Sequence, residues 1–114
     1  MQADILVVDD EAEIADLVEV YLRSEGFAVR KAATAAQALQ LVAQQEPDLA
    51  LLDVMLPDGD GFALCSRLRE SYLFPILMLT ARVEDTDKIT GLNKVHRWLL
   101  LQIPIMLRVH VSIS

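Results

Sequence analysis

The sequence predicts an α/β fold in which a buried parallel sheet carries helices on both faces. Short, continuous apolar runs alternate along the chain with segments whose apolar residues recur at helical spacing. Continuous apolar runs are typical of strands that are covered on both faces, and repeated strand–helix units favour a parallel sheet. A chain of 114 residues has the length of one domain with a single core.

The first strand is predicted at Ile5–Val8, which is a continuous apolar run. A helix is predicted after it, because the apolar residues that follow lie on one helical face: Ile14, Leu17, Val18, Tyr21 and Leu22. Gly26 stands where a residue in the left-handed conformation commonly ends a helix. A weaker, edge-like strand is predicted at Ala28–Ala32.

The second helix is indicated by Thr34 and Gln37, which have the spacing of a capping box. Pro47 ends this helix, because the residue before a proline disfavours the helical conformation. The third strand is predicted at Leu49–Leu52 and the fourth at Pro75–Leu79.

Two further helices are predicted in the second half of the chain. One runs from about Phe62 to Glu70 and follows a turn-rich loop at residues 56–61, in which Asp58 and Asp60 are expected to serve turn and cap geometry. The other is short and covers roughly residues 84–92.

Polar side chains follow three of the predicted strands: Asp9 and Asp10, Asp53, and Thr80. The carboxyl ends of parallel strands meet at one edge of the sheet, where ligands of such folds bind. Two carboxylates about 4 Å apart repel each other by roughly 4 kcal/mol at an effective dielectric constant near 20. A divalent cation removes this repulsion, and Mg²⁺ prefers oxygen ligands. The sequence therefore predicts a Mg²⁺ site suited to phosphoryl chemistry.

Composition excludes several other classes of protein. A net charge of −7 argues against direct binding of a nucleic-acid backbone. The single cysteine, Cys65, cannot form an internal disulfide, and its apolar neighbours favour a small core residue.

Asp4 interrupts the first apolar run, so no signal peptide is expected, and the longest apolar stretch, at 98–107, is far shorter than a membrane helix. We expect a soluble protein of the cytoplasm.

Three spaced motifs resemble the receiver domain of bacterial two-component response regulators, in particular the OmpR/PhoB type. They are Val8–Glu11, Leu52–Gly61 and Leu79–Arg82, and the resemblance extends over residues 4 to about 93. It implies a flavodoxin-like (βα)5 fold, which is a doubly wound parallel sheet with strand order 2-1-3-4-5.

The resemblance also implies a role for each candidate residue. Asp53 would accept a phosphoryl group from the phosphohistidine of a sensor histidine kinase. Asp9, Asp10, Asp53 and the main-chain carbonyl of Met55 would hold Mg²⁺, and Thr80 would contact the new phosphoryl group. The domain would be a switch rather than an enzyme, limited to self-phosphorylation from small donors and self-dephosphorylation. It would regulate transcription through an output domain absent from this chain.

Simpler interpretations of single residues remain open at this point. Asp10 and Glu13 together could form a helix N-cap and capping box instead of a metal site. Lys88 is interpreted as a solvated helix residue rather than a phosphate ligand.

The chain departs from the family pattern after residue 93, so we divide it into a receiver core at 1–93 and an atypical segment at 94–114. Gln102 or Ile103 stands where the family has a lysine. The segment carries +3 and no acidic residue, whereas residues 1–93 carry −10, which suggests a shifted reading frame, a truncated gene or an artificial junction. Residues 98–101 could form a fifth strand. A missing or altered last helix would expose apolar surface and favour a homodimer or larger assembly.

Two rival functions follow from these features. A pseudo-receiver would keep the fold and bind proteins without being phosphorylated, as the missing lysine allows. A Mg²⁺-dependent phosphohydrolase of another α/β class is disfavoured, because such enzymes commonly carry an Asp-x-Asp pattern after the first strand. Here Asp9 and Asp10 are contiguous. The sequence names neither the sensor kinase nor the regulated genes.

Overall fold

Strands and helices alternate through the part of the chain that the structure, a computed structural model, describes, which is residues 3–79. One sheet contains the strands β1 (Asp4–Val8), β2 (Ala28–Ala32), β3 (Leu49–Asp53) and β6 (Ile76–Leu79). The helices of this part are α1 (Ala12–Ser24), α2 (Ala35–Gln44) and α3 (Gly61–Arg69). A small antiparallel hairpin between β3 and α3 consists of β4 (Met55–Leu56) and β5 (Gly59–Asp60).

The strands of the larger sheet are parallel and lie in the order β2-β1-β3-β6. This is the order predicted for the first four strands, and it confirms the doubly wound α/β fold. The helix predicted at 84–92, the fifth strand at 98–101 and the altered last helix lie outside the described residues. None of the helices within residues 3–79 is long and apolar enough to cross a membrane.

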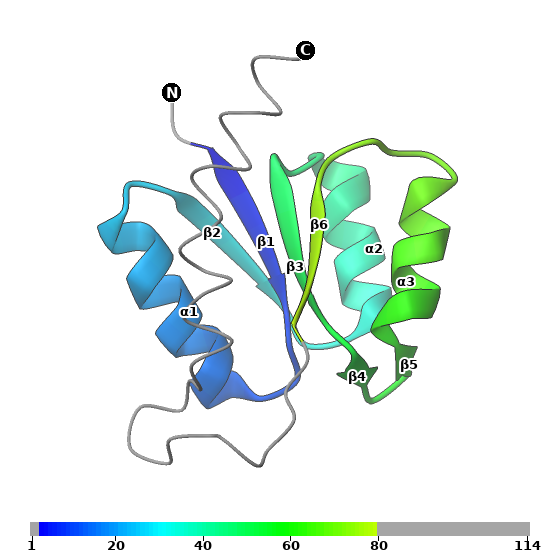
Figure 1. Cartoon of the computed structure of the whole chain (residues 1–114), viewed down its shortest axis with the longest axis horizontal. Coiled ribbons are helices and arrows are strands. Elements are labelled where there is room, and N and C mark those ends of the chain that lie inside the picture. The colour runs from blue at the N-terminus through cyan, green and yellow to red at the C-terminus, as the bar shows by residue number, and fades with distance from the viewer. Residues whose placement is uncertain (1–2, 80–114) are drawn as a thin grey trace.

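Alternate residues of each central strand enter two different cores. Ile5 and Val7 of β1 pack with α1 on one face of the sheet, whereas Leu6 and Val8 pack with α2 and α3 on the other. Figure 1 shows α1 on one side of the sheet and α2 and α3 on the opposite side. Because both faces are covered, all four residues are fully buried, which explains the continuous apolar run. Cys65 is half-buried and packs against the second core, as predicted.

The ends of α1 explain one difference from the sequence interpretation. Glu11 occupies the N-cap position of α1, where no side-chain hydrogen bond caps the helix, so the capping box considered for Asp10 and Glu13 is wrong. At the other end, Gly26 has a φ of 92°, and the N–H of Phe27 donates to the carbonyl of Leu22. The left-handed glycine expected there is confirmed.

Side chains cap both of the other helices. The Thr34 hydroxyl accepts a hydrogen bond from the Gln37 N–H at 3.1 Å, and the Gln37 side chain accepts from the Ala33 N–H at 2.8 Å. In a standard capping box the Gln37 side chain would accept from the N–H of the N-cap residue, Thr34. Here it accepts from the N–H of the preceding residue, Ala33, so this half of the predicted capping box differs by one residue. The Asp60 carboxylate accepts from the Ala63 N–H at 2.6 Å, which confirms its predicted cap role.

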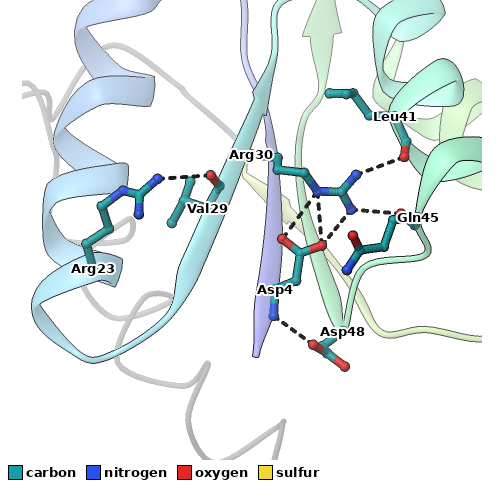
Figure 2. A network of polar contacts seen from close by, with 7 residues as sticks. All are labelled: Asp4, Arg23, Val29, Arg30, Leu41, Gln45 and Asp48. Atoms are coloured by element: carbon teal, nitrogen blue, oxygen red, sulfur yellow. Dashed lines mark hydrogen bonds and ion pairs between the residues drawn. The ribbon is translucent and has the colours of Figure 1, made fainter. Parts of the chain in front are cut away.

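A network centred on Arg30 fastens the amino end of the sheet (Figure 2). The guanidinium donates to the buried side chain of Asp4 from two nitrogens and also to the carbonyls of Leu41 and Gln45 at the end of α2. The N–H of Asp4 donates to the carboxylate of Asp48 at 2.7 Å. One arginine on β2 therefore connects β1 with the last turn of α2.

Candidate metal centre

Three carboxylates meet at the carboxyl edge of the sheet. Asp9 and Asp10 follow β1 directly, and Asp53 is the last residue of β3, the strand that pairs with β1. One carboxylate oxygen from each residue lies within 4.8 Å of the others. The side chains of Asp9 and Asp53 are buried, with only 6% of each residue exposed, whereas Asp10 is exposed. Parallel pairing of two neighbouring strands thus brings together residues that are more than forty positions apart in the chain.

Burial makes negative charge at this edge unfavourable. It raises the pKa of Asp9 from 3.8 to about 7, although the N–H of Glu11, which donates to Asp9 at 2.9 Å, opposes the shift. The nearby charge of Asp53 contributes to the same increase in the pKa of Asp9. The pKa of Asp53 is also raised, first by burial and then by the charge of Asp10. A cation would stabilise the ionised form of these groups.

The donor set fits a hard divalent ion. Three carboxylates supply oxygen ligands and an excess of negative charge, which is the environment that Mg²⁺ occupies in phosphoryl-transfer proteins. Mg²⁺ keeps several water molecules and binds few carboxylates, so a partly exposed site suits it. Asp9, Asp10 and Asp53 are therefore the residues that could hold the metal.

Met55 orients the Asp53 side chain through its main chain. Its N–H donates to Oδ1 of Asp53 at 3.2 Å and partly offsets the pKa increase. The Met55 side chain is 76% exposed, so any part it has in the site comes from its backbone. Asp53 thus carries a hydrogen bond from the segment that follows it in the chain.

Gly61 is a residue whose role the sequence interpretation missed. A Cβ atom at this position would overlap the main-chain carbonyl oxygen of Asp53 and would also lie 2.8 Å from the Met78 side chain. The Gly61 N–H donates to the carbonyl of Val54 at 2.7 Å. The first residue of α3 therefore packs directly on the backbone of Asp53. The Gly-rich turn motif pointed to this position, but only the fold shows what the glycine contacts.

Asp58 forms a connection across the chain that no local pattern predicted. Its two carboxylate oxygens accept hydrogen bonds from the N–H groups of Ala35 and Ala36 at 2.8 and 3.0 Å. These bonds lower the pKa of Asp58, with Ala35 as the larger cause. The expected cap role is confirmed, but the helix that Asp58 caps is α2, not the one that follows it.

The remaining predicted site residue is not placed. Thr80 lies outside the described residues, as do Lys88 and the positions Gln102 and Ile103. The strand before Thr80 is nevertheless described: Leu79 of β6 pairs in register with Asp53 of β3.

A cavity of about 220 Å³ opens beside the carboxylates. Asp9, Asp10 and Ala12 line one part of it, and Lys31 and Gln37 line another. It lies between the start of α1 and the loop from β2 to α2, next to Asp9 and Asp10.

Comparison with known proteins decides the family. The family model described as response regulator receiver domain matches residues 5–99. This chain belongs to that family. Receiver domains of response regulators act as phosphoacceptor switches in two-component systems, where sensor histidine kinases phosphorylate them, and Mg²⁺ binding at an acidic cluster is a general property of the family.

Among curated proteins, the receiver domain is similar to regulatory proteins of enterococci. It is 53% identical to the regulatory protein VanRc of Enterococcus gallinarum over 93 aligned residues. The alignment covers 82% of this chain and 40% of that protein. The chain spans about 40% of the length of the curated relatives it matches.

Solved structures agree with this assignment. A protein of Chloroflexus aurantiacus assigned as a response regulator superposes with a TM-score of 0.80 and 36% identity, over 95% of this chain and 99% of that one. The BeF3-activated N-terminal receiver domain of RstA from Klebsiella pneumoniae superposes with a TM-score of 0.76 and 30% identity, over 92% of this chain and 98% of that one. The flavodoxin-like receiver fold is thereby confirmed.

Proposed function

We propose that this receiver domain is a phosphorylation-controlled switch in which Asp53 accepts a phosphoryl group from a sensor histidine kinase. Asp9, Asp10, Asp53 and the main-chain carbonyl of Met55 hold the Mg²⁺ ion. The observation that carries the proposal is the meeting of three carboxylates within 4.8 Å at the carboxyl edge of the sheet. Mg²⁺, when bound, neutralises charge on the carboxylates and on the transferring phosphoryl group.

The chemistry asked of Asp53 is a single displacement. A carboxylate oxygen of Asp53 forms a bond to phosphorus while the bond from phosphorus to the kinase imidazole nitrogen breaks, and the imidazole keeps the electron pair. The product is an acyl phosphate. An aspartate nucleophile needs no base, so positioning and charge neutralisation provide the catalysis. The bond from the Met55 N–H to Oδ1 supports this role, because it fixes the orientation of the Asp53 carboxylate.

The rest of the switch extends the same proposal. Thr80 contacts the new phosphoryl group, which adds negative charge and strong hydrogen-bond acceptors at the end of β6. Residues 1–93 form the receiver core, and the segment 94–114 favours self-association of the domain. The whole protein regulates transcription in the cytoplasm, and this domain, with its net charge of −7, does not bind nucleic acid itself.

Mass spectrometry after incubation with Mg²⁺ and acetyl phosphate tests the phosphoacceptor. We expect the wild-type domain to gain the mass of one phosphoryl group and Asp53→Asn to gain none. Glu13→Gln, which removes an exposed carboxylate from the first turn of α1, is the matched control and should be phosphorylated like the wild type. Equal phosphorylation of wild type and Asp53→Asn would contradict the proposal.

One sequence feature favours a second candidate function. The lysine of the family pattern is replaced by Gln102 or Ile103, which would suit a protein-binding module that is never phosphorylated. This candidate predicts Mg²⁺ binding without any gain of phosphoryl mass, so the same experiment separates the two.

A further inference from the structure

We propose that Asp58 is a positioning residue for the phosphoacceptor. It tethers the β4–β5 hairpin to the N-terminus of α2 and thereby fixes the orientation of the Asp53 carboxylate. This inference rests on the proposed function of Asp53, because it concerns the same site.

The tether is a pair of hydrogen bonds between segments far apart in sequence. Asp58 lies in the turn between β4 and β5, and its carboxylate accepts from Ala35 at 2.8 Å and from Ala36 at 3.0 Å. The first N–H groups of a helix have no partner within the helix. Thr34 satisfies the N–H of Gln37, and Asp58 satisfies the two N–H groups before it. The hairpin thus takes part in capping α2.

The hairpin transmits this constraint to Asp53. Met55 pairs with Asp60, and Leu56 pairs with Gly59, so the two strands form one paired unit. The N–H of Met55, at the start of this unit, donates to Oδ1 of Asp53 at 3.2 Å. A continuous series of contacts therefore leads from the first turn of α2 through Asp58 and Met55 to the phosphoacceptor.

The base of the hairpin is fixed independently of its tip. The Gly61 N–H donates to the Val54 carbonyl at 2.7 Å, and Gly61 packs on the backbone of Asp53. The fixed base is Val54 and Gly61, so loss of the Asp58 contacts would leave these two residues in place and remove the hydrogen bonds that hold the rest of the hairpin, Met55 to Asp60, to α2. We therefore expect the hairpin to swing about its base, which would loosen the Met55 N–H and, with it, the Asp53 carboxylate.

Two other side chains provide matched controls. Thr34→Ala removes the remaining cap of α2 but keeps the tether, so it measures the effect of a less stable helix end. Asp60→Ala removes a carboxylate from the same hairpin and a cap from α3, so it matches both the charge change and the loss of a cap. A purely structural role of Asp58 would make Asp58→Ala resemble these two variants.

The experiment compares Mg²⁺ affinity, by calorimetric titration, and hydrogen exchange of the Met55 amide in the full chain. We expect Asp58→Ala to bind Mg²⁺ about tenfold more weakly than Asp60→Ala and Thr34→Ala, as is typical when a residue that orients a metal ligand is removed. The Met55 amide should exchange faster only in Asp58→Ala. Asp58→Asn, which keeps one acceptor oxygen, should lie between Asp58→Ala and the wild type.

Each outcome separates the two proposals. If the wild type binds Mg²⁺ and is phosphorylated on Asp53, but Asp58→Ala matches its two controls in both measurements, the tether inference is overturned and the proposed function stands. If the wild type binds no Mg²⁺, both are overturned.

Discussion

At the scale of single residues, Asp9 shows what burial does to a carboxylate. Its pKa is about 7 in the folded domain, against 3.8 for the exposed group, mainly because burial disfavours its charge. The folded state therefore binds more protons than the unfolded state between these two pH values. The contribution of Asp9 to stability is greatest below pH 3.8 and is lost as the pH rises to about 7.

This reasoning predicts how Asp9→Asn affects the metal-free domain. The pKa difference corresponds to roughly 4 kcal/mol of lost stability, because one pKa unit is about 1.4 kcal/mol. In the presence of a chelator and above pH 7, Asp9→Asn should unfold at a higher urea concentration than the wild type. The advantage should vanish near pH 3.8. A stability difference between Asp9→Asn and the wild type that does not change with pH across this range would contradict the prediction. Glu13→Gln, which removes an exposed carboxylate, is the control and should show no such pH-dependent difference.

Residue by residue, the sequence revealed the acidic cluster but not what surrounds it. Asp9, Asp10 and Asp53 could be found because each follows an apolar run, and parallel strands place such residues at one edge. The contact of Gly61 with the Asp53 backbone depends on how α3 enters the fold, which no local pattern encodes. Asp58 and the helix it caps are more than twenty residues apart for the same reason.

At the scale of elements, β2 and α2 are joined by the Arg30 network at the end of the sheet opposite the carboxylates. The Asp4 side chain is only 12% exposed and pairs with Arg30 at 2.6 Å. Removing one member of such a pair leaves the other charge poorly solvated. The two helix carbonyls that Arg30 contacts would also lose a donor.

We therefore predict that Arg30→Ala lowers the free energy of unfolding by about 2–3 kcal/mol, less than for a fully buried pair because the arginine is partly exposed. Arg23→Ala, which breaks the exposed pair with Glu19 and a hydrogen bond to the Val29 carbonyl, should cost less, about 1 kcal/mol. Denaturant unfolding measures both changes. Neither variant should alter Mg²⁺ affinity, and a large loss of affinity in Arg30→Ala would show that the two ends of the sheet are coupled.

Element boundaries were predictable where one physical signal dominated. The bounds of the four strands in the larger sheet differ from the predicted ones by one residue at most. For β1 and β3 the signal is strong because a fully buried strand needs a continuous apolar run. The hairpin at Met55–Asp60 was expected only as a turn-rich loop, since strands of two residues carry no periodic pattern. The start of α1 was also ambiguous, because three acidic residues precede it and the N-cap, Glu11, makes no side-chain hydrogen bond.

At the scale of the whole molecule, the site exists because β1 and β3 are neighbours in the sheet. The chain runs from β1 out to β2 at the edge and returns to β3 on the other side of β1, with α1 on one face and α2 and α3 on the opposite face (Figure 1). Such a change of direction is where ligands bind in open α/β sheets. The central claim is that this topology builds a divalent metal site from Asp9, Asp10 and Asp53.

Calorimetric titration with Mg²⁺ tests this claim most directly, because it requires no phosphoryl donor. We predict that the wild-type domain binds one Mg²⁺ ion and that Glu13→Gln binds it with similar affinity. Asp9→Asn and Asp53→Asn should each bind it at least about tenfold more weakly, because each loses a carboxylate ligand. Wild-type affinity in both Asp9→Asn and Asp53→Asn would contradict the account.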